Sequence, residues 1–426
     1  MLYRKIIHEK TEYLEKATRY LLYAVMLCLP SYLLRLEWFG VRTNILDTLL
    51  LLGALFFVVR LWTEKKGKHL FSMIQRQSFF FTGVLFLLLG VVYSAYMSEG
   101  ISPKEWGILK SWFFLPFLFA FLFYVFYAKN TKVQNTAILL YVWSSGVLSL
   151  VFLILSLASY GMTYDDRLKG WYDSPNQLAL FLAPAVLFLW TEMRRKQSSQ
   201  SLNFRKFGTY FGFMVTSTTL LLTESLGGIL SLLGGIILYE YTRSRFFTEG
   251  RMHIFFKGFL LFFVFLGIFF FFAFEKHMIE INPEDRSSLS SRFMIWQSAW
   301  DIGKESWLWG IGPGNFQEKY LEYQTLYPPY LEWAVPHPHN IFLSFWLQSG
   351  FLGFLGFVII CGWTLFRMFL SVSQRTNKKE LELFLIGFLF LTLLWGLVDT
   401  PYWRNDLSVL FWMMLFSNTF SRTPNY

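Results

Sequence analysis

Residues 45–68, ILDTLLLLGALFFVVRLWTEKKGK, combine an apolar run, an edge with arginine and tryptophan, and a positively charged ending. A helix needs roughly 17 to 25 apolar residues to cross the hydrocarbon core of a bilayer. Arginine and tryptophan at 60 to 62 are typical of the headgroup level, and the EKKGK band is typical of a cytoplasmic loop. The stretch therefore predicts a transmembrane helix that ends at the inner membrane face.

The same pattern recurs along most of the 426 residues. The chain is 54% hydrophobic, 21% aromatic and only 15% charged, with a mean hydropathy of +0.41, which excludes an ordinary soluble protein. We predict an all-α, polytopic integral membrane protein, a single membrane domain over 1–426, with about twelve transmembrane helices. These helices are expected at residues 18–37, 44–61, 78–97, 107–127, 135–159, 175–191, 207–223, 226–242, 254–274, 341–368, 381–398 and 405–420.

Positive charge predicts the orientation of the helices. The bands EKKGK, MRRK, RSR and RTNKK fall on alternate loops, and cytoplasmic loops retain lysine and arginine. Both termini are therefore expected in the cytoplasm, in a protein of the cytoplasmic (inner) membrane. The formal charge of +10 reflects the basic cytoplasmic loops and does not indicate a nucleic-acid partner. The largest loop, 275–340, carries nine acids against five bases.

Residues 275–340, between the ninth and tenth predicted helices, are expected to form an extracytoplasmic helical loop that carries the catalytic groups. Ser290 or Ser291 is expected to cap a helix lying along the membrane surface. Arg292 opens that helix, where a guanidinium can bind a pyrophosphate with two parallel hydrogen bonds. The alternative is an arginine that contacts lipid phosphate. GIGPGNF, at 310–316, is expected to be a plain turn, because it has no phosphate-loop ending.

The loop closes with HPHN, at residues 337–340. Pro338 favours extended backbone, so the rings of His337 and His339 are expected to point in different directions. A neutral imidazole can take a proton from a hydroxyl and act as a general base. Two alternatives remain: histidines that pack at the interface, and a zinc site with further ligands such as His277. No cofactor motif is present, and we expect no resident metal.

A second group of polar residues lies upstream in DRLKGWYDSPNQLALFLAPA. Ser174 followed by Pro175 is typical of a helix start. Arg167 and Lys169 then lie on the external loop and Asn176 lies in the first helical turn, where the three could bind a second anionic group. Solvated loop charges are the alternative interpretation.

Taken in order, these motifs resemble the O-antigen ligase and polymerase superfamily of membrane proteins that transfer glycans. The resemblance rests on Arg292 in R-x-x-x-W, on WGIGPGNF, on HNIFL followed by QSGFLG, and on RLxGW…SPNQLA at 167–179. It implies a glycan donor carried on polyprenyl pyrophosphate and metal-independent transfer with inversion. It also implies that His339 is the catalytic histidine, with His337 in reserve, that Arg292 binds the pyrophosphate, and that Asn340 lies at the substrate.

One motif departs from the family. Many members have an arginine in a Ser-Arg-Gly turn where this chain reads TESLGG, with Leu226 after Ser225. Arg167, or Arg404 in TPYWRND, is the candidate substitute. The acceptor could be a lipid-anchored sugar, the end of a growing glycan or, less favoured, a protein. Two other classes stay open: a transporter or lipid flippase, and a polyprenyl-phosphate-sugar glycosyltransferase, for which Glu37 is the acidic candidate.

Overall fold

The computed structural model describes residues 2–38, 41–128, 130–195, 202–243, 288–328, 335–373 and 379–418. The predicted helix at 254–274 and His277 lie outside these residues. The described elements are α1 (Leu2–Leu27), η1 (Leu29–Leu33), β1 (Arg35–Trp38), β2 (Val41–Asn44), α2 (Ile45–Thr63), α3 (Gly67–Arg76), α4 (Ser78–Glu99), α5 (Pro103–Ile108), η2 (Leu109–Phe114), α6 (Leu115–Tyr127), α7 (Thr131–Ser156), α8 (Pro175–Arg194), α9 (Leu202–Leu222), α10 (Leu226–Arg243), α12 (Ser288–Glu305), α13 (Phe316–Tyr323), η3 (Gln324–Leu326), α14 (Ile341–Ser373), α15 (Lys379–Trp395) and α16 (Asn405–Asn418).

The architecture is that of an all-α, multi-pass membrane protein. Within the described residues, six helices are long and apolar enough to cross a bilayer: Ile45–Thr63, Ser78–Ser98, Pro103–Tyr127, Thr131–Ser156, Pro175–Arg194 and Ile341–Met368. The predicted number of about twelve is therefore not supported. Helices α9, α10, α15 and α16 nevertheless lie where helices were predicted, although α16, with 14 residues, is shorter than the roughly 20 that span a bilayer.

The first predicted membrane helix, 18–37, is wrong in its second half. Helix α1 ends at Leu27, and Pro30 lies in the 3-10 turn that follows. Proline has no backbone N–H and restricts its own φ angle, so a helix does not continue through it easily. The next residues instead form an antiparallel hairpin in which Arg35 is paired with Asn44. In the part of the chain that the structure describes, this hairpin is the one sheet, and it departs from the all-α prediction.

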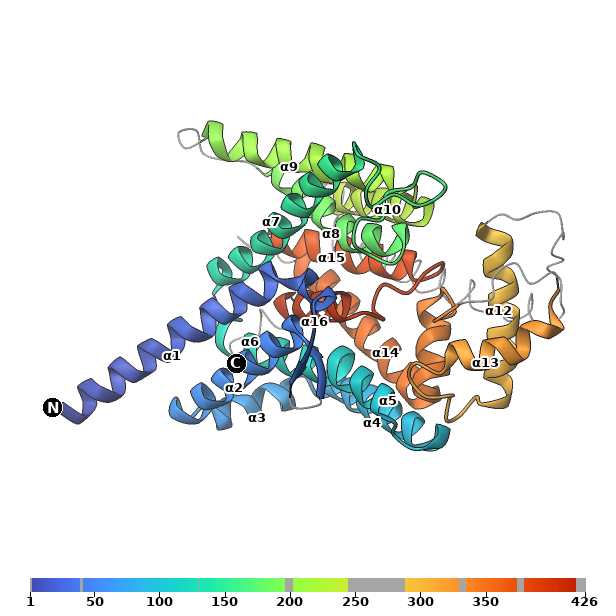
Figure 1. Ribbon diagram of the computed structural model, residues 1–426. Helices are drawn as coiled ribbons and strands as arrows, with labels where there is room; N and C mark the ends of the chain where they lie inside the picture. Colours follow the sequence, from blue (N-terminus) through green and yellow to red (C-terminus); the bar gives the residue numbers. More distant parts are fainter. Residues whose placement is uncertain are drawn as a thin grey trace.

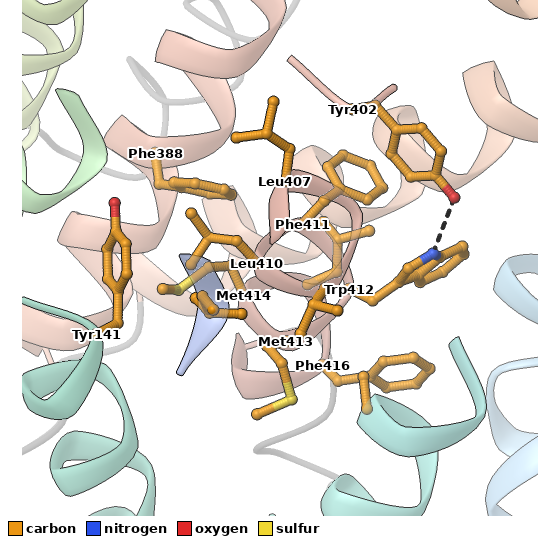
Figure 2. Packing of buried hydrophobic residues seen from close by; sticks show 14 of the residues in the cluster. Tyr141, Phe388, Tyr402, Leu407, Leu410, Phe411, Trp412, Met413, Met414 and Phe416 are labelled. Carbon is orange, nitrogen blue, oxygen red and sulfur yellow. Dashed lines mark hydrogen bonds between the residues drawn. The ribbon is translucent and has the colours of Figure 1, made fainter. Parts of the chain in front are cut away.

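Helix α16 occupies the centre of the bundle (Figure 1). All of its residues from Asp406 to Ser417 are buried. Phe411, Trp412 and Phe416 pack among the surrounding helices, and the Trp412 indole donates a hydrogen bond to the Tyr402 hydroxyl over 3.2 Å (Figure 2). A largely apolar helix that is buried on every face is a core helix. The turn that leads into α16 is therefore held firmly, and it carries two residues of the candidate site.

Helices α4 and α14 approach each other through glycines. A Cβ atom added to Gly90 would lie 2.3 Å from the backbone nitrogen of Gly353, and one added to Gly356 would lie 2.4 Å from the nitrogen of Leu87. Small residues allow membrane helices to pack with their backbones close together. This packing positions the start of α14, which directly follows the HPHN segment.

Segments predicted to share a membrane face contact one another. Lys104 and Glu318, from two predicted external loops, form an ion pair of 2.9 Å. At the opposite end, predicted cytoplasmic segments are joined by the ion pairs Arg194–Glu240 and Arg243–Glu380. The contacts therefore agree with the alternation predicted from charge, while the assignment of each end to a compartment stays a prediction.

Candidate functional site

A histidine and a carboxylate form the centre of the candidate site. Nδ1 of His339 lies 3.2 Å from Oδ1 of Asp399, which is only 2% exposed and stands in the turn between α15 and α16. If Nδ1 donates its proton to the carboxylate, Nε2 has a free lone pair and can accept a proton. Asp399 was not identified from the sequence. The available indication was an acidic residue at the end of an apolar run, in VDTPYWRND.

The backbone around His339 is clamped from both sides. The Trp296 indole donates to the carbonyl oxygen of Pro338 over 2.9 Å, and the Asn340 amide donates to the carbonyl oxygen of Leu397 over 2.9 Å. The Asn340 side-chain oxygen also accepts hydrogen bonds from the backbone N–H groups of Phe342 and Leu343, in the first turn of α14. Both ends of the Asn340 side chain, predicted to lie at the substrate, are therefore engaged in holding this segment.

The expectation that the two histidine rings diverge is wrong. Their centroids are 4.7 Å apart, and the rings meet edge to face at 80°. The reason is the backbone of His339, whose φ of 45° lies in the left-handed region and turns the chain back on itself. Such a conformation costs about 1–3 kcal/mol in a residue other than glycine and is common at functional sites. The clamp of Trp296 and Asn340 sustains it.

The charges at the site follow from burial and from neighbouring groups. Burial, aided by the charge of His339, lowers the pKa of His337 to about 4, so His337 is neutral at pH 7. Burial raises the pKa of Asp399, but the hydrogen bond from His339 and the nearby positive charges of His339 and Arg292 hold it well below its usual range. Asp399 is therefore ionised, and the Arg292 guanidinium lies within electrostatic range of it.

Arg292 is carried by α12, which begins at Ser288 among the described residues. Ser290 and Ser291 lie inside this helix, so neither is its N-cap as predicted. The helix buries Met294, Ile295, Trp296, Ala299 and Ile302 in a small core shared with α13. Figure 1 shows α12 and α13 together at one side of the bundle, next to α14. Helix α12 therefore packs against α13 and α14 through its apolar side chains.

The GIGPGNF segment attaches α12 and α13 to the bundle. The N–H of Gly312 donates to the Ser94 hydroxyl over 3.0 Å, and the N–H of Gly314 donates to the Gln348 side chain over 2.8 Å. Both glycines have φ angles above 80°, which side chains with a Cβ rarely adopt. Because α4 and α14 use these N–H groups, the segment is a structural turn, as predicted.

Arg167 lies beside the segment in which the family arginine is replaced. Its Nε donates to the carbonyl oxygen of Thr223 over 3.0 Å, and its Nη2 lies 3.4 Å from the side-chain oxygen of Asn176. Ser174 caps α8, as predicted. The structure thus brings together Arg167 and Asn176, two of the three predicted upstream residues. Arg167 contacts the backbone of Thr223, which precedes Leu226 by three residues. Within the described part of the chain, the Lys169 side chain makes no hydrogen bond or ion pair.

Arg404 is bound within the protein. It is 7% exposed and donates two parallel hydrogen bonds, of 2.6 and 2.8 Å, to the carboxylate of Asp406. A third bond of 2.9 Å reaches the carbonyl oxygen of Gln177, and its guanidinium lies 4.8 Å from the ring centroid of Tyr172. Burial lowers the pKa of Arg404, but the Asp406 charge more than offsets this. Its positive charge is therefore largely neutralised before any ligand arrives.

Three residues could also hold a metal ion. Ligand atoms of His337, His339 and Asp399 all lie within 4.8 Å of one another. Catalytic zinc sites commonly use three protein ligands of these types. The metal-independent mechanism implied by the resemblance therefore stays a prediction that needs a direct test.

Comparison with known proteins adds one match to this geometry. Residues 211–358 match the family model described as O-antigen ligase. The predicted resemblance to the O-antigen ligase superfamily is confirmed. The matched region of this O-antigen ligase domain contains Arg292, His337 and His339, whereas Asp399 and Arg167 lie outside it. No curated protein matches the chain. The family indicates a membrane enzyme that processes glycans.

Proposed function

We propose that the protein transfers a glycan from polyprenyl (undecaprenyl) pyrophosphate to a sugar hydroxyl at the outer face of the cytoplasmic membrane. The observation that supports this most is the pair formed by His339 and Asp399, with Arg292 within electrostatic range of Asp399. His339 and Arg292 lie in the region that matches the O-antigen ligase family. Such a transfer needs a proton acceptor for the attacking hydroxyl and a cation for the departing pyrophosphate.

In the proposed reaction, Nε2 of His339 takes the proton of the acceptor hydroxyl as its oxygen attacks the anomeric carbon. The bond from that carbon to the pyrophosphate oxygen breaks on the opposite face, which inverts the configuration, and its electron pair leaves with the pyrophosphate. Arg292 stabilises this developing charge. Asp399 keeps the proton of the neutral ring on Nδ1 and stabilises the imidazolium that forms. His337, neutral and in ring contact with His339, is the reserve base.

We assign the missing family cation to Arg167. It contacts the backbone of the TESLGG segment directly, with Asn176 beside it and Lys169 on the same loop. Arg404 is the weaker candidate, because Asp406 already accepts from its Nε and Nη2 along one edge of the guanidinium, and the carbonyl oxygen of Gln177 accepts from Nη1. In this assignment Arg292 and Arg167 bind the pyrophosphate together, which stabilises the additional negative charge that the pyrophosphate gains as it leaves.

The acceptor in this proposal is a lipid-anchored saccharide, which makes the protein a ligase. A polysaccharide polymerase of the same superfamily would use the end of a growing glycan, and a protein acceptor is the third option. The transporter or flippase hypothesis is less well supported, because transporters place ionisable groups near the membrane midplane, whereas His339, Asp399, Arg167 and Arg404 gather at helix ends. The acidic-site alternative, with Glu37 in the β1–β2 hairpin, is less well supported because residues 211–358 match the O-antigen ligase family.

The test uses purified protein in lipid nanodiscs with an undecaprenyl-pyrophosphate glycan and a panel of saccharide acceptors. Loss of a general base lowers the rate about 10²- to 10⁴-fold, so His339→Ala is expected to reduce transfer by that factor. Arg292→Ala is expected to weaken donor binding, and His69→Ala, at the opposite end of the bundle, is the control.

Each assay is repeated with a chelator. Unchanged transfer supports a base acting without metal. If the chelator abolishes transfer and His339→Ala retains it, the base assignment fails. One product addition per acceptor indicates a ligase, whereas a ladder of products indicates the polymerase.

A further inference from the structure

We infer that a large cavity on the His337 side of the site binds the saccharide chain of the acceptor; this inference rests on the proposed function. The cavity has a volume of about 1330 Å³. It lies between the β1–β2 hairpin, the start of α2, the η2 segment and the turn before α8, and its wall includes His337 and Arg404. It therefore extends from the neighbour of the proposed base.

The position of the cavity separates it from the donor cations. His337 lines it, whereas Arg292 and Arg167 do not. Inversion requires the acceptor oxygen to attack from the face opposite the leaving pyrophosphate, so the two substrates must approach the reacting carbon from different sides. A space that adjoins His337 but lacks the proposed pyrophosphate ligands is thus placed for the acceptor.

The charges on the cavity wall are nearly balanced. Arg35, Lys104, Lys110 and Arg404 are opposed by Glu37, Asp47 and Asp173. A polyanion or a pyrophosphate would need a clear excess of positive charge, so the wall favours an uncharged or weakly charged ligand with many hydrogen-bonding groups.

Aromatic rings complete the wall, with Trp112, Trp171 and Trp403 among them. Sugars present hydroxyl groups at their edges and C–H groups on their faces, which suits a wall of ionic groups and indole rings. The cavity also exceeds the roughly 300–1,000 Å³ of a pocket for a drug-sized ligand. Its size and chemistry therefore fit an oligosaccharide of several units.

The inner wall is built on an unusual local structure. Residues 109–114 form a π-helix. This conformation is rare in proteins, and where it occurs it often lies at a functional site. It brings Lys110 and Ser111 to the carboxylate of Asp47, at 3.2 and 2.5 Å, and Asn405 donates to the same carboxylate over 3.1 Å. The Lys110 side chain is 26% exposed. Because an ammonium has three donors, Lys110 can bind a sugar hydroxyl while it keeps its ion pair.

The test blocks the cavity chemically in the full-length protein. Trp171→Cys, in a Cys28→Ser and Cys361→Ser background, places the sole thiol on the wall, and a bulky maleimide then fills the space. The matched control is Trp106→Cys. Trp106 is 56% exposed against 52% for Trp171, but it does not line the cavity. Each variant is compared with itself before and after labelling, which removes effects of the substitution on folding.

Labelling at position 171 is expected to raise the acceptor KM at least about tenfold, equivalent to about 1.4 kcal/mol, while the Kd for undecaprenyl pyrophosphate stays unchanged. Labelling at position 106 changes neither. Lys110→Gln is expected to raise the acceptor KM with little change in kcat.

Retained acceptor affinity after labelling at position 171, or loss of undecaprenyl-pyrophosphate binding, would overturn the assignment of the cavity. A different failure, in which the unlabelled background protein transfers no glycan to any acceptor, would count against the proposed function itself.

Discussion

Replacing Asp399 with asparagine removes the charge that orients His339 and keeps the shape of the side chain. The carboxylate lies 3.2 Å from Nδ1 and is 2% exposed, so solvent cannot take over its role. A hydrogen bond to a charged group contributes about 1.5–3 kcal/mol, which corresponds to a rate loss of about 10- to 150-fold at 1.36 kcal/mol per tenfold. An amide that donates to Nδ1 also moves the ring proton to Nε2. Because Nε2 can then no longer accept a proton, the fall in kcat approaches about 10⁴-fold.

The assay measures kcat at saturating donor and acceptor, together with the donor Kd. We expect kcat to fall by these factors while the donor Kd stays within about twofold. Glu322→Gln is the control, because this carboxylate is 61% exposed on α13 and its ion pair with Lys319 lies on the surface. A kcat for Asp399→Asn within about threefold of the native value would refute the role of Asp399 in orienting the base.

Three further outcomes are expected. Burial lowers the pKa of His337 to about 4, so only the unfolded chain takes up this proton as the pH falls from 6.5 to 4. Thermal unfolding should therefore show a stability loss of about 3 kcal/mol through that window, and His337→Asn should flatten it. Gly90→Ala forces α4 away from α14 and should cost about 1–3 kcal/mol, whereas Gly146→Ala, with open space around its Cβ, should not lower the unfolding midpoint. Arg404→Gln leaves a buried carboxylate unpaired and should destabilise the fold by about 3–5 kcal/mol. Arg167→Gln should instead keep the midpoint and raise the donor Kd; the opposite pattern would transfer the pyrophosphate role to Arg404.

The positions of the helices could be predicted because a membrane helix is a local property. An apolar run of sufficient length must form a helix to satisfy its own backbone, whatever surrounds it. The starts of α2 and α8 agree closely with prediction, and the Ser174 cap is confirmed. The end of α1 was missed because the apolar run continues past Pro30, where the helix stops.

The site itself could be predicted only in part. His339 belongs to a recognisable motif, but Asp399 stands 60 residues later, and no local pattern connects the two. The left-handed backbone of His339 depends on the Trp296 clamp, which is a tertiary contact. The pairing of Arg404 with Asp406 could not be predicted, because the sequence between two apolar runs does not distinguish a solvent-exposed arginine from a buried and paired one.

The late position of Asp399 and α16 in the chain has a consequence for biosynthesis. A ribosome reaches residues 399–416 only after the helices that surround α16 have been made. A nascent chain that ends before this point contains the HPHN segment, yet it has neither the carboxylate that contacts His339 nor the helix that fills the middle of the bundle. In the proposed mechanism, the orientation of the base is therefore completed only after the last described helix has been made.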